Sequence, residues 1–248
     1  MTIDSEVPIE TSDGVMSTFI THPEGDGPWP TVLFLMDAPG KREELHDMAR
    51  RWAGHGYFVM LPHLYYRSTD GFELDFDSDE SRKVMTELMM GLSNRMIERD
   101  AAAAFAWADE QPLADADNVG CLGYCMSGPF AVWVAASFPD RVKAGASLYG
   151  VRLVVEPDTR NDSPHNRLGD IAGELYVATA ERDSYAPPEM VDALEAAMAA
   201  SGVRGSLERY PDTDHGFAFP DRAVYKADAA EHHWDVLVDL FGRNLSAG

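Results

Sequence analysis

The sequence is poor in basic residues and has no long hydrophobic run. Lysine and arginine number 20 against 42 aspartates and glutamates in 248 residues, which gives a formal net charge of −22. Nucleic acid and anionic membrane surfaces bind through cationic patches, so neither is an expected partner. No apolar segment reaches membrane-spanning length. The start, Met1-Thr2-Ile3-Asp4-Ser5-Glu6, lacks the basic and apolar regions of a signal peptide.

Cysteine is also scarce, and metal-ligand clusters are missing from the sequence. Cys121 and Cys125 are the only cysteines, and two cysteines four residues apart cannot build a disulfide framework. The eight histidines are scattered along the chain. We therefore expect a reduced, cytoplasmic protein with no metal site, either a monomer or a small homo-oligomer. The length suits a single domain over residues 1–248.

Short apolar runs alternate with segments of helical periodicity along the chain. A hairpin is predicted over 6–22, with strands at 31–36, 57–62, 118–124, 144–149, 174–180 and 206–210. Helices are predicted at 41–55, 80–92, 95–110, 127–138, 187–202 and 222–245, and 151–170 is predicted to be a surface excursion. Met89 and Met90 are expected in a helix core rather than in a pocket wall. The alternation predicts an α/β fold with a mostly parallel, doubly wound sheet, whose ligands bind at the carboxyl ends of the strands.

The stretch Val119-Gly120-Cys121-Leu122-Gly123-Tyr124-Cys125-Met126-Ser127-Gly128 is typical of a nucleophile elbow. A strand leads into a sharp turn that holds one reactive residue, here Cys125, and a helix begins at once. The helix N-terminus favours a thiolate and any oxyanion formed beside it. A buried structural cysteine is the commoner alternative, and we assign it to Cys121, which lies inside the apolar run.

A cysteine nucleophile needs a base, and the base needs a group that orients it. In an α/β-hydrolase sheet the chain order is nucleophile, acid, histidine. Asp183 follows the strand that ends near residue 180, and His215 follows the strand that ends near residue 210. Each residue is weak evidence alone, since an aspartate in a loop is usually a turn former or helix cap. Together their order predicts the triad Cys125, Asp183 and His215.

These segments resemble the dienelactone hydrolase (carboxymethylenebutenolidase) family. Gly123-Tyr124-Cys125-Met126-Ser127-Gly128 resembles the family's Gly-Tyr-Cys-x-Gly-Gly elbow, and His215-Gly216-Phe217-Ala218 resembles its histidine motif. Pro62-His63-Leu64-Tyr65 and Tyr149-Gly150 resemble two further segments. The similarity runs from about residue 30 to the C-terminus. It implies an α/β-hydrolase fold and a carboxylic ester hydrolase that acts on a small-molecule lactone or ester without metal or organic cofactor.

The resemblance also implies roles for residues after the first central strand. Asp37 stands where the family has a carboxylate, usually glutamate, thought to help activate the cysteine, although a plain turn residue before Pro39 is an alternative reading. The backbone N–H groups of Ala38 and Met126 are expected to form the oxyanion hole.

Other positions depart from the family pattern and leave the substrate open. Ser127 replaces a glycine, and Phe219 stands about where well-known members carry an arginine for the substrate carboxylate. Arg82 and Arg152 are candidate replacements for that cation. Tyr124 and Tyr149 are candidate pocket residues, for which ordinary packing is an equal alternative.

Two other functions compete with lactone hydrolysis. A broad carboxylesterase or thioesterase of the same fold is favoured by the missing arginine at 219. A hydrolase scaffold that binds a ligand without turning it over is the alternative from another class, and the intact set of Cys125, Asp183 and His215 argues against it.

Overall fold

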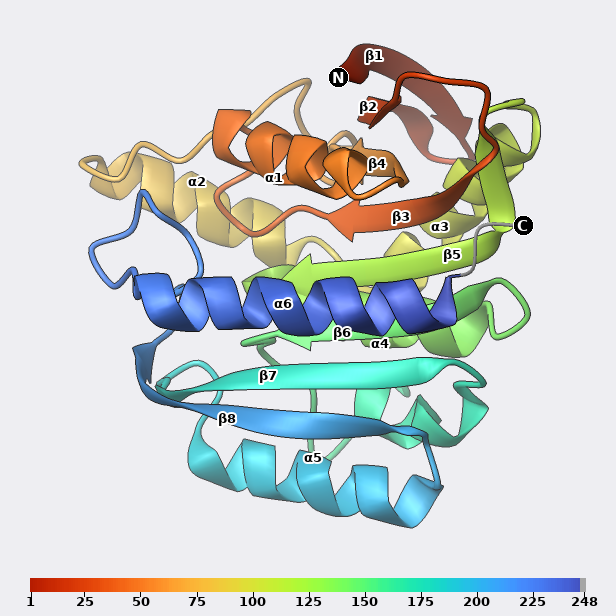
Figure 1. Ribbon diagram of the computed structural model, residues 1–248. Coiled ribbons are helices and arrows are strands. Elements are labelled where there is room, and N and C mark those ends of the chain that lie inside the picture. The colour runs from red at the N-terminus through yellow and green to blue at the C-terminus, as the bar shows by residue number, and fades with distance from the viewer. Residues whose placement is uncertain (246–248) are drawn as a thin grey trace.

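An eight-stranded sheet forms the centre of the molecule (Figure 1). The computed structural model describes residues 1–245. The strands are β1 (Thr2–Thr11), β2 (Gly14–Pro23), β3 (Trp29–Leu35), β4 (Phe58–Pro62), β5 (Ala114–Tyr124), β6 (Val142–Leu148), β7 (Glu174–Arg182) and β8 (Gly205–Asp214). Their order is β1-β2-β4-β3-β5-β6-β7-β8. The β1–β2 and β2–β4 pairs are antiparallel and the other pairs are parallel, so the carboxyl ends of β3 to β8 lie at one edge.

Six α-helices cover the two faces of this sheet. They are α1 (Glu43–Gly54), α2 (Asp79–Met90), α3 (Asn94–Asp109), α4 (Gly128–Ser137), α5 (Pro188–Ser201) and α6 (Ala227–Asn244) among the described residues. Figure 1 shows α1 and α6 on one face, with α3 and α4 behind the sheet. Residues 128–136 of α4 are all buried. A helix that is apolar all round is expected in a core position rather than at the surface.

The predicted α/β-hydrolase fold with a mostly parallel sheet is confirmed, and the predicted strands and helices are all present with shifted ends. The largest shift concerns the last helix, which begins at Ala227 rather than at 222. Residues 215–226 instead form turns closed by backbone hydrogen bonds, such as Phe217 N–H to the Asp214 carbonyl. Phe217 and Phe219 are buried in these turns, so core packing of two aromatic rings replaces the first helical turns.

The segment 151–170 is less of a surface excursion than predicted. It contains a 3₁₀ helix, η2 (Pro164–Asp170), and it buries Leu153, Ser163 and Leu168. The Ser163 hydroxyl accepts a hydrogen bond of 2.9 Å from the Val155 N–H. This part of the prediction was wrong because isolated apolar residues in an aperiodic segment gave no sign that they pack under α4.

No helix within residues 1–245 is both long enough and apolar enough to cross a membrane.

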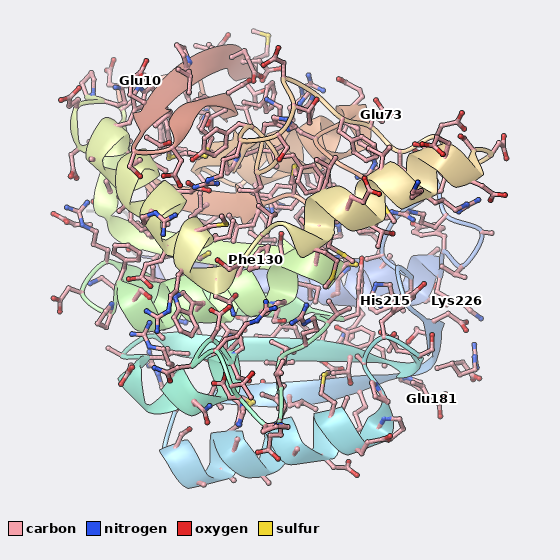
Figure 2. All side chains as sticks on the ribbon, turned by 180° about the vertical axis from the view of Figure 1, so that it is seen from behind. Glu10, Glu73, Phe130, Glu181, His215 and Lys226 are labelled. Atoms are coloured by element: carbon pink, nitrogen blue, oxygen red, sulfur yellow. The ribbon has the colours of Figure 1, made fainter. Side chains whose placement is uncertain are left out.

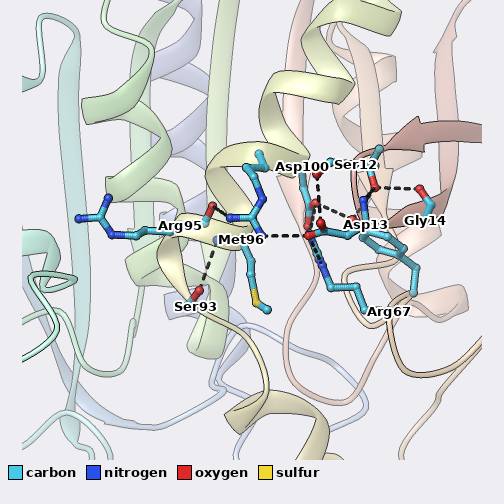
Figure 3. Close-up of polar contacts among 11 residues, drawn as sticks. Ser12, Asp13, Gly14, Arg67, Ser93, Arg95, Met96 and Asp100 are labelled. Carbon is cyan, nitrogen blue, oxygen red and sulfur yellow. Dashed lines mark hydrogen bonds and ion pairs between the residues drawn. The ribbon is translucent and has the colours of Figure 1, made fainter.

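A buried ion-pair network holds the N-terminal hairpin against α3 (Figure 3). The Asp100 carboxylate, only 2% exposed, accepts hydrogen bonds of 2.9 and 2.6 Å from the Arg67 guanidinium and one of 2.8 Å from the Tyr66 hydroxyl. Arg67 and Arg99 also bind Asp13, in the turn between β1 and β2. The network therefore connects a loop, a helix and the hairpin.

We expect Asp100→Ala to lower the free energy of unfolding by about 3 kcal/mol, since it removes the buried carboxylate that Arg67 and Tyr66 share and leaves Arg67 only the part-exposed Asp13. Asp117→Ala, which removes an exposed carboxylate 3.8 Å from Arg141, should change it by less than about 1 kcal/mol. Urea unfolding followed by circular dichroism measures both. Equal effects of the two substitutions would show that the network does not stabilise the hairpin.

Candidate active site

Cys125 lies in the sharp turn that the sequence predicts. β5 ends at Tyr124, Cys125 has φ of +54°, and η1 (Cys125–Ser127) leads into α4. A non-glycine residue with positive φ is strained, and such residues cluster at functional sites. Cys125 is half-buried, whereas Cys121 is fully buried and its thiol pKa is raised by burial. Only Cys125 is therefore placed to react.

Close packing around the turn explains its small residues. A Cβ added at Gly123 would lie 2.2 Å from the Ser127 carbonyl oxygen, and one at Gly128 would lie 2.4 Å from the Gly150 Cα. Ser127, which replaces a family glycine, is accommodated with its hydroxyl donating to the carbonyl of Met36. The substitution therefore adds a tie between the elbow and the end of β3.

Asp183 and His215 meet at the carboxyl edge of the sheet, one residue beyond the ends of β7 and β8. Asp183 Oδ2 is 2.7 Å from His215 Nδ1. The other carboxylate oxygen accepts hydrogen bonds from the N–H groups of Tyr185 and Ala186 at 2.9 and 3.2 Å. These backbone donors fix the carboxylate, and the carboxylate in turn orients the imidazole ring.

His215 also interacts electrostatically with the cysteine. Nε2 is buried and makes no hydrogen bond of ordinary geometry to a described residue. Burial acts to lower the His215 pKa, but interactions with Asp183 and with the Cys125 sulfur outweigh it and raise the pKa to about 10. The imidazole ring lies between two tyrosines, with centroid distances of 5.1 Å to Tyr149 and 5.0 Å to Tyr185. The structure thus brings the three predicted residues together.

Asp37 is buried and paired with two arginines that sequence reasoning missed. Its Oδ1 is 2.5 Å from Arg42 Nη1, and its Oδ2 is 3.2 Å from Arg222 Nη2. Arg222 lies three residues beyond Phe219 in the sequence, so its closeness to the position of the family arginine was a sequence signal for this cation. No local signal indicates the pairing of Arg42 with Asp37.

Phe219 occupies a buried position between these two cations. The guanidinium carbons of Arg42 and Arg222 lie 5.2 and 5.7 Å from the centre of its ring. The Arg222 Nε is buried and has no hydrogen-bond partner among the described residues. The Phe219 ring therefore packs against two arginines in the region where the family pattern has one arginine.

Ala38 and Met126, the predicted oxyanion-hole residues, are both buried and share one neighbour. The Tyr65 hydroxyl donates to the Ala38 carbonyl at 2.9 Å and lies 3.3 Å from the Met126 Sδ. Tyr65 thus links the loop after β3 to the residue after Cys125. This arrangement can hold the peptide groups of Ala38 and Met126 in a constant relative position.

The two candidate pocket tyrosines have different surroundings. Tyr124 is fully buried behind the elbow, and its hydroxyl is 2.9 Å from His233 Nε2. This placement favours packing over substrate contact. Tyr149 is also buried, but its hydroxyl has no hydrogen-bond partner among residues 1–245. Burial raises its pKa, and the nearby charges of Asp37, Cys125 and Arg222 also act on it, so Tyr149 borders the site.

Arg82 lies on α2, whereas Arg152 follows Val151, whose N–H donates to the Cys125 carbonyl, and lines a cavity beside the elbow. Arg82 is an exposed residue of α2 that contacts the Phe76 carbonyl and, at 3.9 Å, Asp79. Arg152 extends toward Met90, with 3.8 Å between Nη1 and Sδ. Arg82 and Arg152 are therefore weaker candidates than Arg222 for the cation that replaces the family arginine. The interpretation of Met89 and Met90 as helix core was wrong for Met90, which is 57% exposed. Met89 packs against the hydrophobic core, but both residues also line a cavity.

Among residues 1–245, no group of three or more histidine, cysteine, aspartate or glutamate side chains could hold a metal ion. Figure 2 shows His215 near Lys226 and Glu181, at the end of the sheet where the chemistry is expected.

Comparisons with known proteins agree with the fold. The family model for the dienelactone hydrolase family matches residues 16–245. A Methylorubrum extorquens protein with the provisional name carboxymethylenebutenolidase is 31% identical, over 96% of this chain and 80% of that protein. A Synechocystis protein with the same provisional name is 29% identical, over 99% of this chain and 100% of its own length.

Solved structures show the same fold. A Klebsiella pneumoniae protein provisionally described as a dienelactone hydrolase aligns with a TM-score of 0.88 and 24% identity, over 98% of this chain and 99% of its own. A dienelactone hydrolase-like promiscuous phosphotriesterase from metagenomic libraries aligns with a TM-score of 0.80 and 20% identity, over 99% of both chains. The fold and site define an α/β hydrolase. The chain belongs to the dienelactone hydrolase family and is accordingly a carboxylic ester hydrolase.

We expect Gly123→Ala to disrupt the elbow, because the added methyl group would collide with the Ser127 carbonyl. The free energy of unfolding should fall by about 1–3 kcal/mol, and alkylation of Cys125 by iodoacetamide should slow. Gly54→Ala, in a helix with no atom within 4 Å of the new Cβ, should leave alkylation unchanged and raise stability by at most about 1 kcal/mol. Unchanged alkylation in both variants would contradict the proposed packing of the elbow.

The pKa of His215 offers a second test. Because it is raised from 6.5 to about 10, the stabilisation from its charged form is complete below about pH 6.5 and is lost as pH rises through about 10. Histidine NMR should show an imidazolium at pH 8 for His215, whereas His233, whose pKa burial lowers to about 4, should be neutral. Asp183→Asn removes a hydrogen bond that raises the His215 pKa, so this variant should titrate at lower pH. A neutral His215 at pH 8 in the unsubstituted protein would contradict the assignment.

Proposed function

We propose that this protein hydrolyses lactones or activated esters through Cys125 as nucleophile, His215 as general base and acid, and Asp183 as the residue that orients His215. One observation carries the proposal. His215 is held by Asp183 at 2.7 Å, and the same imidazole interacts electrostatically with a strained, half-buried cysteine. A cysteine placed only for packing has no need of such a partner.

In the first half of the reaction the Cys125 thiolate attacks the carbonyl carbon of the substrate. The backbone N–H groups of Ala38 and Met126 stabilise the resulting oxyanion. When the tetrahedral intermediate collapses, the C–O bond breaks and the leaving oxygen takes a proton from His215 Nε2 where it needs one. The product of this half is an acyl thioester on Cys125.

In the second half neutral His215, which has given its proton to the leaving oxygen or to solvent, takes a proton from water as the water attacks the thioester carbonyl. Asp183 holds the imidazole in the correct tautomer and stabilises the imidazolium that forms. Collapse of the second tetrahedral intermediate releases the carboxylic acid and regenerates the thiolate. A thiolate leaves more readily than an alkoxide, so stable alkyl esters should be poor substrates and lactones or aryl esters better ones.

The cations beside Asp37 bear on the choice of substrate. Arg222 is part-exposed, with 22% of its side chain accessible, and it has a free Nε. We propose Arg222 as the group that receives a substrate carboxylate in place of an arginine at position 219, with Asp37 and Phe219 as residues that position it. This assignment favours carboxylated lactones. The absence of an arginine at position 219 favours the alternative, a broad esterase that accepts neutral substrates.

We also propose a cytoplasmic location, because a thiol nucleophile stays reduced there.

The test is hydrolysis of a dienelactone and of p-nitrophenyl acetate, each with the unsubstituted protein and with Cys125→Ala. We expect both substrates to react and Cys125→Ala to reduce kcat by at least about 10³-fold, since loss of a nucleophile removes the covalent route. Arg222→Gln should raise KM for the carboxylated lactone and leave p-nitrophenyl acetate unchanged.

Hydrolysis of the aryl ester alone would support the broad esterase. Retained activity in Cys125→Ala would contradict the proposal as a whole.

A further inference from the structure

A cavity of about 280 Å³ lies beside the elbow and takes no part in the proposed bond-making steps. It is enclosed by the end of α2, the junction of α2 and α3, the first turn of α4 and the segment after β6. Its volume is close to the lower limit of roughly 300 Å³ for small-molecule pockets. The cavity suits a compact group rather than a large ligand.

Backbone contacts join this cavity to the reacting cysteine. Met126, the residue after Cys125, forms part of its wall, and so does Val151. The Val151 N–H donates to the Cys125 carbonyl at 3.1 Å. A group covalently attached to the Cys125 sulfur is therefore within reach of the cavity.

The inner wall is apolar and adaptable. Met89, Leu92, Met126, Pro129, Phe130 and Val155 line it. Methionine side chains are flexible and polarizable, so they can pack against groups of differing shape. Polar residues also line the cavity. Ser93, Asn94, Arg152 and Ser163 contribute to its wall, and Asn94 and Ser163 are buried. The other polar residues, among them Asp158 and Arg160, come from the more exposed segment 157–162.

The position of His215 determines whether the acyl group or the leaving group of an ester can occupy this cavity. The leaving oxygen must lie next to His215 Nε2 to receive its proton, so the leaving group extends along the His215 side of the sulfur. No residue of 181–186 or 211–219 lines the cavity. In Figure 2 Phe130 lies beside the start of α3, and His215 lies well away from it toward Lys226. The cavity is thus on the acyl side of the reacting carbonyl.

We propose that this cavity is the acyl-group pocket of the enzyme and that it selects substrates with a medium-length apolar acyl chain. The inference rests on the proposed function, because it assumes an acyl group attached to Cys125. Met89 is the residue whose size sets the depth of the pocket. It lies in the last turn of α2, half-buried, and takes no part in the reaction.

The experiment compares kcat/KM for p-nitrophenyl acetate, butanoate and hexanoate, which share a leaving group. In the unsubstituted protein we expect a rise of up to about fourfold per methylene, the equivalent of about 0.8 kcal/mol. Met89→Trp should abolish the rise and lower the hexanoate value at least tenfold while leaving the acetate value within twofold. Met89→Ala should move the optimum to a longer chain.

Met85→Trp is the matched control, because Met85 is a half-buried methionine one turn earlier in α2 and does not line the cavity. It should leave the profile unchanged. Phenyl and 2-naphthyl acetate vary the leaving group at constant acyl group, and Met89→Trp should not alter their ratio.

A flat chain-length profile, equal effects of Met89→Trp and Met85→Trp, or an effect that follows the leaving group would overturn the pocket assignment and leave the triad intact. Absence of any Cys125-dependent ester hydrolysis would instead overturn the proposed function, and the pocket with it.

Discussion

The left-handed backbone at Cys125 is the constraint on which the site depends. It is maintained by close contacts on either side, at Gly123 against the Ser127 carbonyl and at Gly128 against Gly150. These contacts involve β5, α4 and the segment after β6, so three parts of the fold hold one residue in a strained conformation. The same geometry leaves Cys125 half-buried at the end of β5, directly before the short helix that leads into α4. Strain at this point is therefore compensated by packing elsewhere.

The distribution of charge at the site differs from that of the molecule as a whole, in which acidic residues predominate. The chain carries a formal charge of −22, yet Arg42 and Arg222 are gathered around the buried Asp37, beside the ring of Phe219. His215 adds a further positive charge when it is protonated next to the sulfur. Glu44 also pairs with Arg42, so two carboxylates match the two arginines. The part of this cluster that an anionic substrate can reach is the part-exposed Arg222 guanidinium.

The sequence was informative wherever a local pattern carries the signal. Short apolar runs predicted the central strands, the Asp13-Gly14 turn predicted the N-terminal hairpin, and the positions of Asp183 and His215 after two strands predicted their meeting at the sheet edge. The ends of elements were less predictable, because the burial of Phe217 and Phe219 delays α6 in a way that periodicity does not indicate. Arg42, Arg222 and the methionine-lined cavity were missed for a related reason. Each depends on contacts between segments far apart in the chain, and Met89 has the same helical spacing whether it faces a core or a cavity.

The central claim of this account is that an acyl group is transferred to the sulfur of Cys125. The most direct measurement is intact-protein and peptide mass spectrometry after rapid acid quenching of the reaction with a slowly hydrolysed aryl ester. The account predicts an added mass equal to the acyl group, located on the peptide that contains Cys125 and sensitive to hydroxylamine as a thioester is. Turnover of the ester with no adduct on Cys125, or with the acyl group on another residue, would contradict it.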